Sequence, residues 1–334
     1  MAENLVKSGR LVTVFGGSGF VGRHVVRALA RRGWRVRNAC RRPDLAGHLQ
    51  PLGASGQIHS VQANLRFPAS VKAALRNADA VVNLVGILSE TGKQSFEALQ
   101  AQGAGTIAQA AAEAGIAAFV HMSAIGADAA SGSAYARSKA AGEQAVLAAV
   151  SSAVILRPSI VFGPEDDFFN RFAAMARVSP VLPLIGGGDT KFQPVFVGDV
   201  AQAAALALDG EAKAGVVYEL GGPEVKSFRE LLAYVLEVTG RARVLAPIPF
   251  GLGAIIAQAT EVADKVSLGL FPRMFVTSRD QVKLLGVDNV VSAAAIAEGR
   301  TLQGLGISAE AIETIVPTYL YRFRKAGQFS AQRD

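Results

Sequence analysis

The sequence predicts an α/β fold: a doubly wound parallel sheet, with a smaller mixed α/β region toward the C-terminal end of the chain. Two observations predict this class. Short apolar runs alternate with stretches of helical periodicity from residue 11 to about residue 163, and such alternation is typical of parallel strands covered by helices on both faces. A glycine-rich turn, residues 16–22, joins the first apolar run to the first helical stretch.

The elements of the sheet follow in order along the chain. Residues 11–15 form an apolar strand, an apolar repeat at helical spacing then predicts a helix, and residues 34–40 give a second strand. Further strands are predicted at 58–65, 79–86, 117–123 and 152–163, and further helices at 70–78, 95–115 and 133–149. Residues 192–208 read as a strand and a helix that return to the sheet.

The chain is long for one domain, at 334 residues. We expect residues 1–163 to form a cofactor-binding domain, to which 189–212 return. The pattern loosens after Gly163, where prolines and the run of glycines at 186–188 indicate loops. Residues 164–188 and 213–334 are therefore predicted to form the smaller substrate-binding or docking region.

Composition points to a reducing compartment. Cys40 is the only cysteine, so no intramolecular disulfide can form.

Only ten residues precede the first strand, too few for a targeting segment. The longest uncharged apolar stretch, between Arg243 and Glu261, is interrupted by prolines and glycines, so we expect no transmembrane segment and a cytoplasmic protein.

The net charge of +7 is concentrated near the N-terminus. Residues 1–42 carry ten lysines and arginines and one acidic residue. No nucleic-acid-binding motif and no interleaved aromatic residues accompany these cations, so we expect no nucleic-acid partner. An anionic cofactor phosphate and an acidic partner surface fit this charge better.

The glycine turn predicts a dinucleotide site of the Rossmann type. Its three spaced glycines allow a tight turn, close approach of the backbone to a pyrophosphate, and close packing of helix on strand. The helix that begins there presents free N–H groups to the phosphates. The predicted cofactor-binding residues of the turn are Gly16, Gly17, Ser18, Gly19, Phe20, Val21 and Gly22. The alternative is a glycine-rich turn without a ligand.

The end of the second strand favours NADP(H) over NAD(H). An acidic residue there would hold a ribose 2′-hydroxyl, but Arg41 and Arg42 stand there instead. Guanidinium groups match a 2′-phosphate in charge and in geometry. The alternative is a solvated basic turn.

Three residues form a candidate catalytic set. Tyr135 and Lys139 are four apart and share one helix face, and Ser123 ends the preceding strand. A lysine ammonium lowers the pKa of a neighbouring phenol, so Tyr135 could exchange a proton while Ser123 holds a carbonyl. Ordinary helix surface is the alternative interpretation.

The glycine turn, Ser123 and the motif YARSK together resemble the short-chain dehydrogenase/reductase superfamily, in its extended and atypical branches. The resemblance implies that Tyr135 is a proton donor, Lys139 its partner and Ser123 the group that holds the carbonyl. It also implies that Tyr135 and Lys139 contact the cofactor. Further cofactor contacts implied by the resemblance are Asn64, Leu65, Val85, Gly86, Pro158 and Ile160. One departure concerns an asparagine of the usual proton relay, whose position is matched here by Gln102.

Several motifs narrow the resemblance. Residues 83–88, 119–128, 135–143, 157–172, 279–291 and 319–329 together resemble the NADPH-binding accessory subunits of respiratory complex I and their bacterial relatives. This resemblance implies a bound NADPH with a structural role, other complex I subunits as partners, and a place at the cytoplasmic face of the inner membrane. A free reductase, dehydrogenase or epimerase is the alternative, and an NADPH-dependent redox sensor is a weaker one.

Two further segments indicate docking. Residues 244–275 are apolar with cations at Lys265 and Arg273, which fits contact with a membrane surface or a partner; packing on the chain's own domain is the alternative. The tail offers Arg322, Arg324 and Lys325 to an acidic or lipid surface. The histidine spacing predicts no metal site. The acidic run at 165–167 fits a helix N-terminus better than paired acid/base catalysis.

Overall fold

The chain folds into two compact units. The computed structural model describes residues 9–267, 272–325 and 327. One unit comprises Met1–Pro158, Val197–Leu220 and Val291–Ser308, and the other comprises Ser159–Phe196, Gly221–Val290 and Ala309–Asp334.

A seven-stranded parallel sheet forms the centre of the first unit. Its strands, in spatial order, are β11 (Val217–Leu220), β6 (Val154–Pro158), β5 (Ala118–Met122), β4 (Ala80–Asn83), β1 (Leu11–Phe15), β2 (Arg35–Cys40) and β3 (Ile58–Gln62). The chain builds outward from β1 in one direction through β2 and β3, then starts again on the other side with β4. The predicted doubly wound α/β class is confirmed, and the reversal beside β1 is where such sheets bind ligands.

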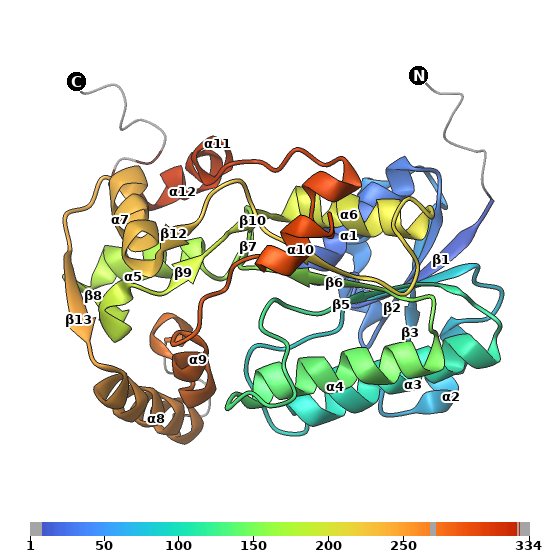
Figure 1. Cartoon of the computed structure of the whole chain (residues 1–334), viewed down its shortest axis with the longest axis horizontal. Helices are drawn as coiled ribbons and strands as arrows, with labels where there is room; N and C mark the ends of the chain where they lie inside the picture. Colours follow the sequence, from blue (N-terminus) through green and yellow to red (C-terminus); the bar gives the residue numbers. More distant parts are fainter. Residues whose placement is uncertain (1–8, 268–271, 326, 328–334) are drawn as a thin grey trace. The chain divides into compact units, whose positions relative to one another are not determined.

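Helices cover both faces of this sheet (Figure 1). One face carries α1 (Phe20–Arg31) and α6 (Val197–Leu208), and the other carries α2 (Pro68–Ala74), α3 (Gln102–Glu113) and α4 (Ala134–Ala149). All five residues of β1 are buried because helices pack on both sides of it. Alanine and glycine line the buried face of α3, which lets this helix lie close to α4.

The helix predicted at 95–115 contains an irregularity. It begins as a π-helical turn, Glu97–Ala101, and only then continues as α3. A π turn places an extra residue in the helical ladder and re-aims the side chains beside it, and such turns are frequent at functional sites. Apolar periodicity alone did not reveal it.

The second unit is a mixed α/β assembly around its own core. Its short strands are β7 (Val161–Phe162), β8 (Val181–Ile185), β9 (Lys191–Phe192), β10 (Val195–Phe196), β12 (Lys226–Ser227) and β13 (Val244–Ile248). Its helices of ten or more residues are α5 (Phe169–Val178), α7 (Phe228–Thr239) and α8 (Phe250–Val266). Its shorter helices are α9 (Arg279–Leu284), α11 (Ile312–Ile315) and α12 (Pro317–Leu320). Phenylalanines at 162, 169, 192 and 228 are buried in its core, together with apolar residues of α5 and α7.

The compact units divide the chain at other places than the predicted 163, 189 and 212. The clearest difference is Val291–Ser308, which belongs with the sheet and includes α10 (Ala293–Ala297). The physical reason is the outer edge of β11. There the Glu219 backbone N–H donates to the Arg300 carbonyl, and the Arg300 guanidinium donates back to the Val217 carbonyl.

Two of the three C-terminal cations form hydrogen bonds within the second unit, although all three were expected to be offered outward. Arg322 donates to the Asn170 side chain, and Arg324 donates to the Val238 carbonyl. Lys325 is exposed. Buried Tyr319 donates to the Asp166 carboxylate, so this segment belongs to the core of its unit. Residues 326, 328 and 329 of the predicted tail motif lie outside the described residues.

Within the acidic run at 165–167, Asp166 has a structural role. It is buried and accepts hydrogen bonds from the backbone N–H groups of Gly163 and Asn170 near the start of α5. It therefore organises this helix start. Among the described residues, no helix combines the length and the apolar character needed to cross a bilayer.

Candidate functional site

Backbone geometry and steric contacts favour glycine at three positions of the turn after β1. Gly16 has a φ of +82°, a conformation that L side chains rarely adopt. A Cβ added to Gly22 would lie 2.2 Å from the Gly16 carbonyl oxygen and 2.6 Å from the Gly17 Cα. A Cβ on Gly17 would lie 2.7 Å from the Asn38 side-chain oxygen. These positions therefore require glycine for the fold itself.

Gly19 is different and faces open space. It is exposed, it is the N-cap of α1, and an added Cβ would meet only the Gly16 carbonyl at 3.4 Å. Neither a capping side chain nor an acidic first-turn residue occupies this helix start. The partly exposed Ser18, Phe20 and Val21 surround it. A helix N-terminus left open in this way fits an anionic group such as a pyrophosphate.

The two arginines after β2 are not equivalent. Both are exposed, but Arg42 is paired with the Asp44 carboxylate at 2.7 Å. This pairing raises the pKa of Arg42 and lowers the pKa of Asp44. Within the described part of the chain, the Arg41 side chain forms no hydrogen bond or ion pair. Arg41 is therefore the cation available to a phosphate at this strand end.

Asn64 and Leu65 follow β3. The Asn64 side-chain oxygen accepts the Arg66 backbone N–H at 3.1 Å and retains a second lone pair. Leu65 packs on the core beneath α3. Asn64 thus keeps acceptor capacity just beyond the C-terminal end of β3.

The loop after β4 connects the glycine turn to the candidate catalytic lysine. A Cβ built on Gly16 would lie 3.2 Å from the Val85 backbone nitrogen, and one built on Gly86 would lie 3.3 Å from the Lys139 Nζ. Lys139 itself donates to the Met122 carbonyl at 3.1 Å, next to Ser123. The structure therefore brings residues of the glycine turn, the β4 loop, the β5 end and α4 together.

Ser123 and Tyr135 complete this group. Ser123 is 3% exposed, and its Oγ has no hydrogen-bond partner within the described residues. Tyr135 lies in the first turn of α4, where its ring packs edge-to-face on Phe96 and faces the Lys139 Nζ at 5.9 Å from the ring centroid. A buried hydroxyl left without a partner is uncommon and fits a site for a ligand oxygen.

Electrostatics at this group oppose the expected activation of the phenol. Burial raises the pKa of Tyr135 to about 12. Burial also lowers the pKa of Lys139 to about 8, although the Glu143 carboxylate partly opposes that change. The neighbouring His121 is buried, and its burial together with the Lys139 charge lowers its pKa to about 3, so it is a neutral core histidine. A phenol with this pKa stays protonated at neutral pH.

Gln102, which was expected at the relay position, lies away from Tyr135 and Lys139 on the exposed side of its helix. Gln102 is exposed and donates to the Glu97 carboxylate. Gln100, within the π turn, is 2% exposed instead; its amide donates to the Ile87 carbonyl at 2.6 Å and accepts from the Ser138 hydroxyl at 3.0 Å. The side-chain amide that contacts α4 is thus that of Gln100. The π turn sets the direction of this side chain, and sequence patterns did not predict that turn.

Pro158 and Ile160 stand on either side of a unit boundary. The Pro158 carbonyl accepts the Ile125 N–H at 3.0 Å, just beyond Ser123. Ile160 belongs to the second unit, where its carbonyl accepts the Val195 N–H. Of the predicted contacts, Ile160 alone lies outside the unit that holds the others.

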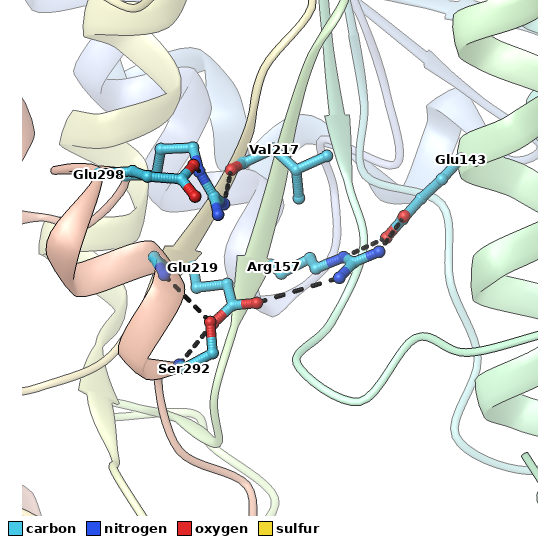
Figure 2. A network of polar contacts seen from close by, with 8 residues as sticks. Glu143, Arg157, Val217, Glu219, Ser292 and Glu298 are labelled. Carbon is cyan, nitrogen blue, oxygen red and sulfur yellow. Dashed lines mark hydrogen bonds and ion pairs between the residues drawn. The ribbon is translucent and has the colours of Figure 1, made fainter.

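A partly buried network of ion pairs, which sequence patterns did not predict, links α4 to β11 and α10 (Figure 2). Glu143, one helical turn after Lys139, accepts two hydrogen bonds from Arg157 at 2.8 and 2.6 Å. Arg157 also lies 4.0 Å from Glu219, whose carboxylate accepts the Ser292 N–H at 2.7 Å. This network connects α4, the helix of Lys139, to the sheet and to the returning segment 291–308.

Several of the cations concentrated near the N-terminus form contacts within the first unit. Arg10 and Arg32 pair with Asp209, and Arg32 also reaches Glu211. Arg37 donates to backbone carbonyls, including that of Ala74 at 2.8 Å. Within the described residues, no group of three or more His, Cys, Asp or Glu side chains could hold a metal ion.

Comparison with known proteins gives a family and close relatives. A family model described as the NAD dependent epimerase/dehydratase family matches residues 12–221. The mitochondrial NADH dehydrogenase (ubiquinone) 1 alpha subcomplex subunit 9 of Arabidopsis thaliana is 36% identical over 324 residues, which cover 96% of this chain and 79% of that protein. The mitochondrial NADH-ubiquinone oxidoreductase 40 kDa subunit of Neurospora crassa is 30% identical over 95% of this chain and 80% of its own length.

Solved structures share the fold. NADPH-dependent quinone oxidoreductase QOR2 of Escherichia coli, complexed with NADPH, superposes with a TM-score of 0.71 at 20% identity and covers 93% of this chain and 99% of its own. The dTDP-glucose 4,6-dehydratase of Bacillus anthracis, in complex with NAD, has a TM-score of 0.61 at 18% identity, over 72% of this chain and 84% of its own. At these identities the likeness shows the fold alone.

Proposed function

We propose, from the premise that this chain belongs to the NAD-dependent epimerase/dehydratase family, that it binds NADP(H) structurally and serves as an accessory subunit of respiratory complex I. One observation carries the proposal. The family model ends at residue 221, whereas the likeness to complex I subunits extends over 96% of the chain. The region beyond the shared cofactor fold is thus also similar to those subunits. The proposed location of the protein is the cytoplasmic face of the inner membrane.

The residues of the first unit fit a dinucleotide. The open start of α1 at Gly19 would hold the pyrophosphate, Arg41 the 2′-phosphate, and Asn64 with Leu65 the adenine. Val85, Gly86 and Pro158 would border the nicotinamide half, and Lys139 would donate to the ribose hydroxyls. When bound, the cofactor could supply a hydride. Burial raises the pKa of the Tyr135 phenol, which makes it a weaker acid and supports a binding role more than turnover.

A test in cells separates assembly from catalysis. In a strain that lacks the chain, we expect native electrophoresis of gently solubilised membranes to show less intact NADH:ubiquinone oxidoreductase. Tyr135→Phe should restore the complex, because the phenol hydroxyl is not needed for docking. The parent chain should migrate with the complex. A chain that migrates alone, in a strain whose complex is unaffected, would refute the proposal.

A free NADPH-dependent reductase is the second candidate, and one observation favours it. The buried Ser123 Oγ has no partner among the described residues and sits at the strand end beside the Lys139 contact. Such a hydroxyl suits a substrate carbonyl. Under this alternative, Tyr135→Phe abolishes a measurable NADPH-dependent reduction and leaves the complex unchanged.

Cofactor preference is expected to depend on Arg41 more than on Arg42. A charge-assisted contact contributes about 1.5–3 kcal/mol, so Arg41→Ala should weaken NADPH roughly ten- to hundredfold and NADH little. Arg42→Ala should have a smaller effect because Asp44 already holds that guanidinium. Calorimetric titration of both nucleotides measures this. Equal affinities in the parent, or an unchanged preference in Arg41→Ala, would contradict it.

Nucleotide affinity is also expected to fall at alkaline pH. The pKa of Lys139 lies at about 8, so its side chain carries a positive charge below that pH and loses the charge above it. Binding that uses the charged form should be strongest below pH 8 and should weaken as the pH rises through that value. Titrations of NADPH between pH 6.5 and 9.5 on the parent and on Lys139→Met check this. The variant should show weaker but nearly pH-independent binding, and the same slope in both would exclude Lys139 as the cause.

A further inference from the structure

Helix α8 of the second unit carries its large apolar side chains on the outside. Its exposed aliphatic residues are Leu252 (50%), Ile255 (63%), Ile256 (42%), Val262 (52%) and Val266 (79%). The side toward its own unit has small residues instead, with Ala257 at 1% exposure and Gly253 buried. This is the reverse of a surface helix that packs its apolar face on its own core.

The exposed side is continuous. At about 100° per residue, Leu252, Ile255, Ile256, Val262 and Val266 fall within one arc of about 120°. Ala259 and Ala263 lie in the same arc, and no charged residue does. The only acidic residues of α8, Glu261 and Asp264, lie on the side toward its own unit. An arc of this width is broader than the narrow seam of two paired helices and resembles the face of a helix that lies in a membrane interface.

A basic rim lies along one flank of this arc. Exposed Arg279 and Lys283 are four apart on α9, which packs beside α8 (Figure 1). Arg279 donates to the Gln258 side chain of α8, which uses one of the five donors of its guanidinium. Together the two cations line a hollow of about 610 Å³ whose floor includes Phe250, Ala254 and Val282. The hollow thus combines an apolar floor with two cations.

We propose that the α8 arc and its basic rim bind the surface of a membrane that contains anionic phospholipid. The aliphatic arc enters the acyl boundary, and Arg279 and Lys283 contact the phosphate groups. Apolar area and cations contribute together in such binding. The inference does not rest on the complex I proposal, because it concerns the isolated chain and lipid. The cations at Lys265 and Arg273, which motivated a surface contact from sequence, are not used, because their side chains lie outside the described ones.

The test is flotation of the purified full chain with vesicles of phosphatidylcholine alone, or mixed with phosphatidylglycerol. We expect binding to the mixed vesicles that weakens with added salt. Ile255→Asp with Val262→Asp should reduce binding by about tenfold or more, since each exposed aliphatic group loses its burial. Arg279→Gln with Lys283→Gln should reduce it by about fivefold per charge.

Matched controls come from elsewhere in the chain. Ile296→Asp replaces an aliphatic residue of the same exposure, 62%, in α10, and Lys213→Gln removes an exposed cation. Both should bind like the parent. Equal binding to both vesicle types, or unchanged binding of the Ile255/Val262 variant, overturns the proposal. A dimer in solution that these α8 substitutions dissociate overturns it too, because the arc would then bind a second copy.

Discussion

Gly22→Ala is expected to lower the melting temperature of the cofactor-free protein by roughly 6–12 °C, from a loss of about 3 kcal/mol. The added Cβ would lie 2.2 Å from the Gly16 carbonyl oxygen and 2.6 Å from the Gly17 Cα. Both are backbone atoms of the tight turn, and Gly16 is held at positive φ. The turn must therefore move away from α1, which separates β1 from its helix.

Gly19→Ala is the matched control, three residues earlier in the same turn. Its Cβ would meet only one backbone oxygen, at 3.4 Å, so the cofactor-free variant should melt like the parent. A ligand at a hundredfold excess over its Kd adds about 2.7 kcal/mol to a folded protein. NADPH should therefore stabilise the parent and stabilise Gly19→Ala much less, since the methyl group would lie where we propose that the pyrophosphate approaches. If Gly22→Ala melts like the parent without cofactor, the steric account of this turn is wrong.

The sequence was most informative where structure is determined locally. The predicted strand at 11–15 and the turn at 16–22 lie at those positions, because apolar runs and glycine spacing are properties of a few adjacent residues. The order of the sheet could be anticipated for a related reason. Alternating strands and helices with short connections leave few topologies, and the doubly wound one is confirmed.

The sequence was least informative where register or distant pairing matters. The π turn at Glu97–Ala101 leaves the apolar periodicity almost unchanged, yet it decides that Gln100 and not Gln102 lies beside α4. The roles of Arg322 and Arg324 depend on carbonyls and amides far away in the sequence, such as Asn170 and Val238. A cation in a tail motif therefore looks free until the fold supplies its acceptor.

Arg157→Met is the second substitution with a large expected effect, a loss of about 2–3 kcal/mol of unfolding free energy. Breaking a buried ion pair is costly because the remaining charge has no partner. The Glu143 side chain is only 7% exposed and would be left in that state, and Glu219 would lose its nearest cation. Arg157 itself is 24% exposed, so the loss should be smaller than for a fully enclosed pair.

The control is an exposed pair with the same separation. Lys72 and Glu113 lie 2.6 Å apart, as do Arg157 and Glu143, but their side chains are 55% and 59% exposed. Lys72→Met should therefore cost less than about 1 kcal/mol. The double variant Arg157→Met/Glu143→Met should recover most of the single loss, since two apolar side chains replace both charges.

Denaturant titration of the parent, both single variants and the double variant measures this coupling. Because Glu143 follows Lys139 by one helical turn, the double variant should also lower the pKa of Lys139 further, since the carboxylate that opposes its loss of charge is gone. The alkaline weakening of NADPH binding should then begin at a lower pH than in the parent. Equal losses of unfolding free energy for Arg157→Met and Lys72→Met would contradict this account. They would show that the ion-pair network in Figure 2 stabilises the fold no more than an ordinary surface pair does.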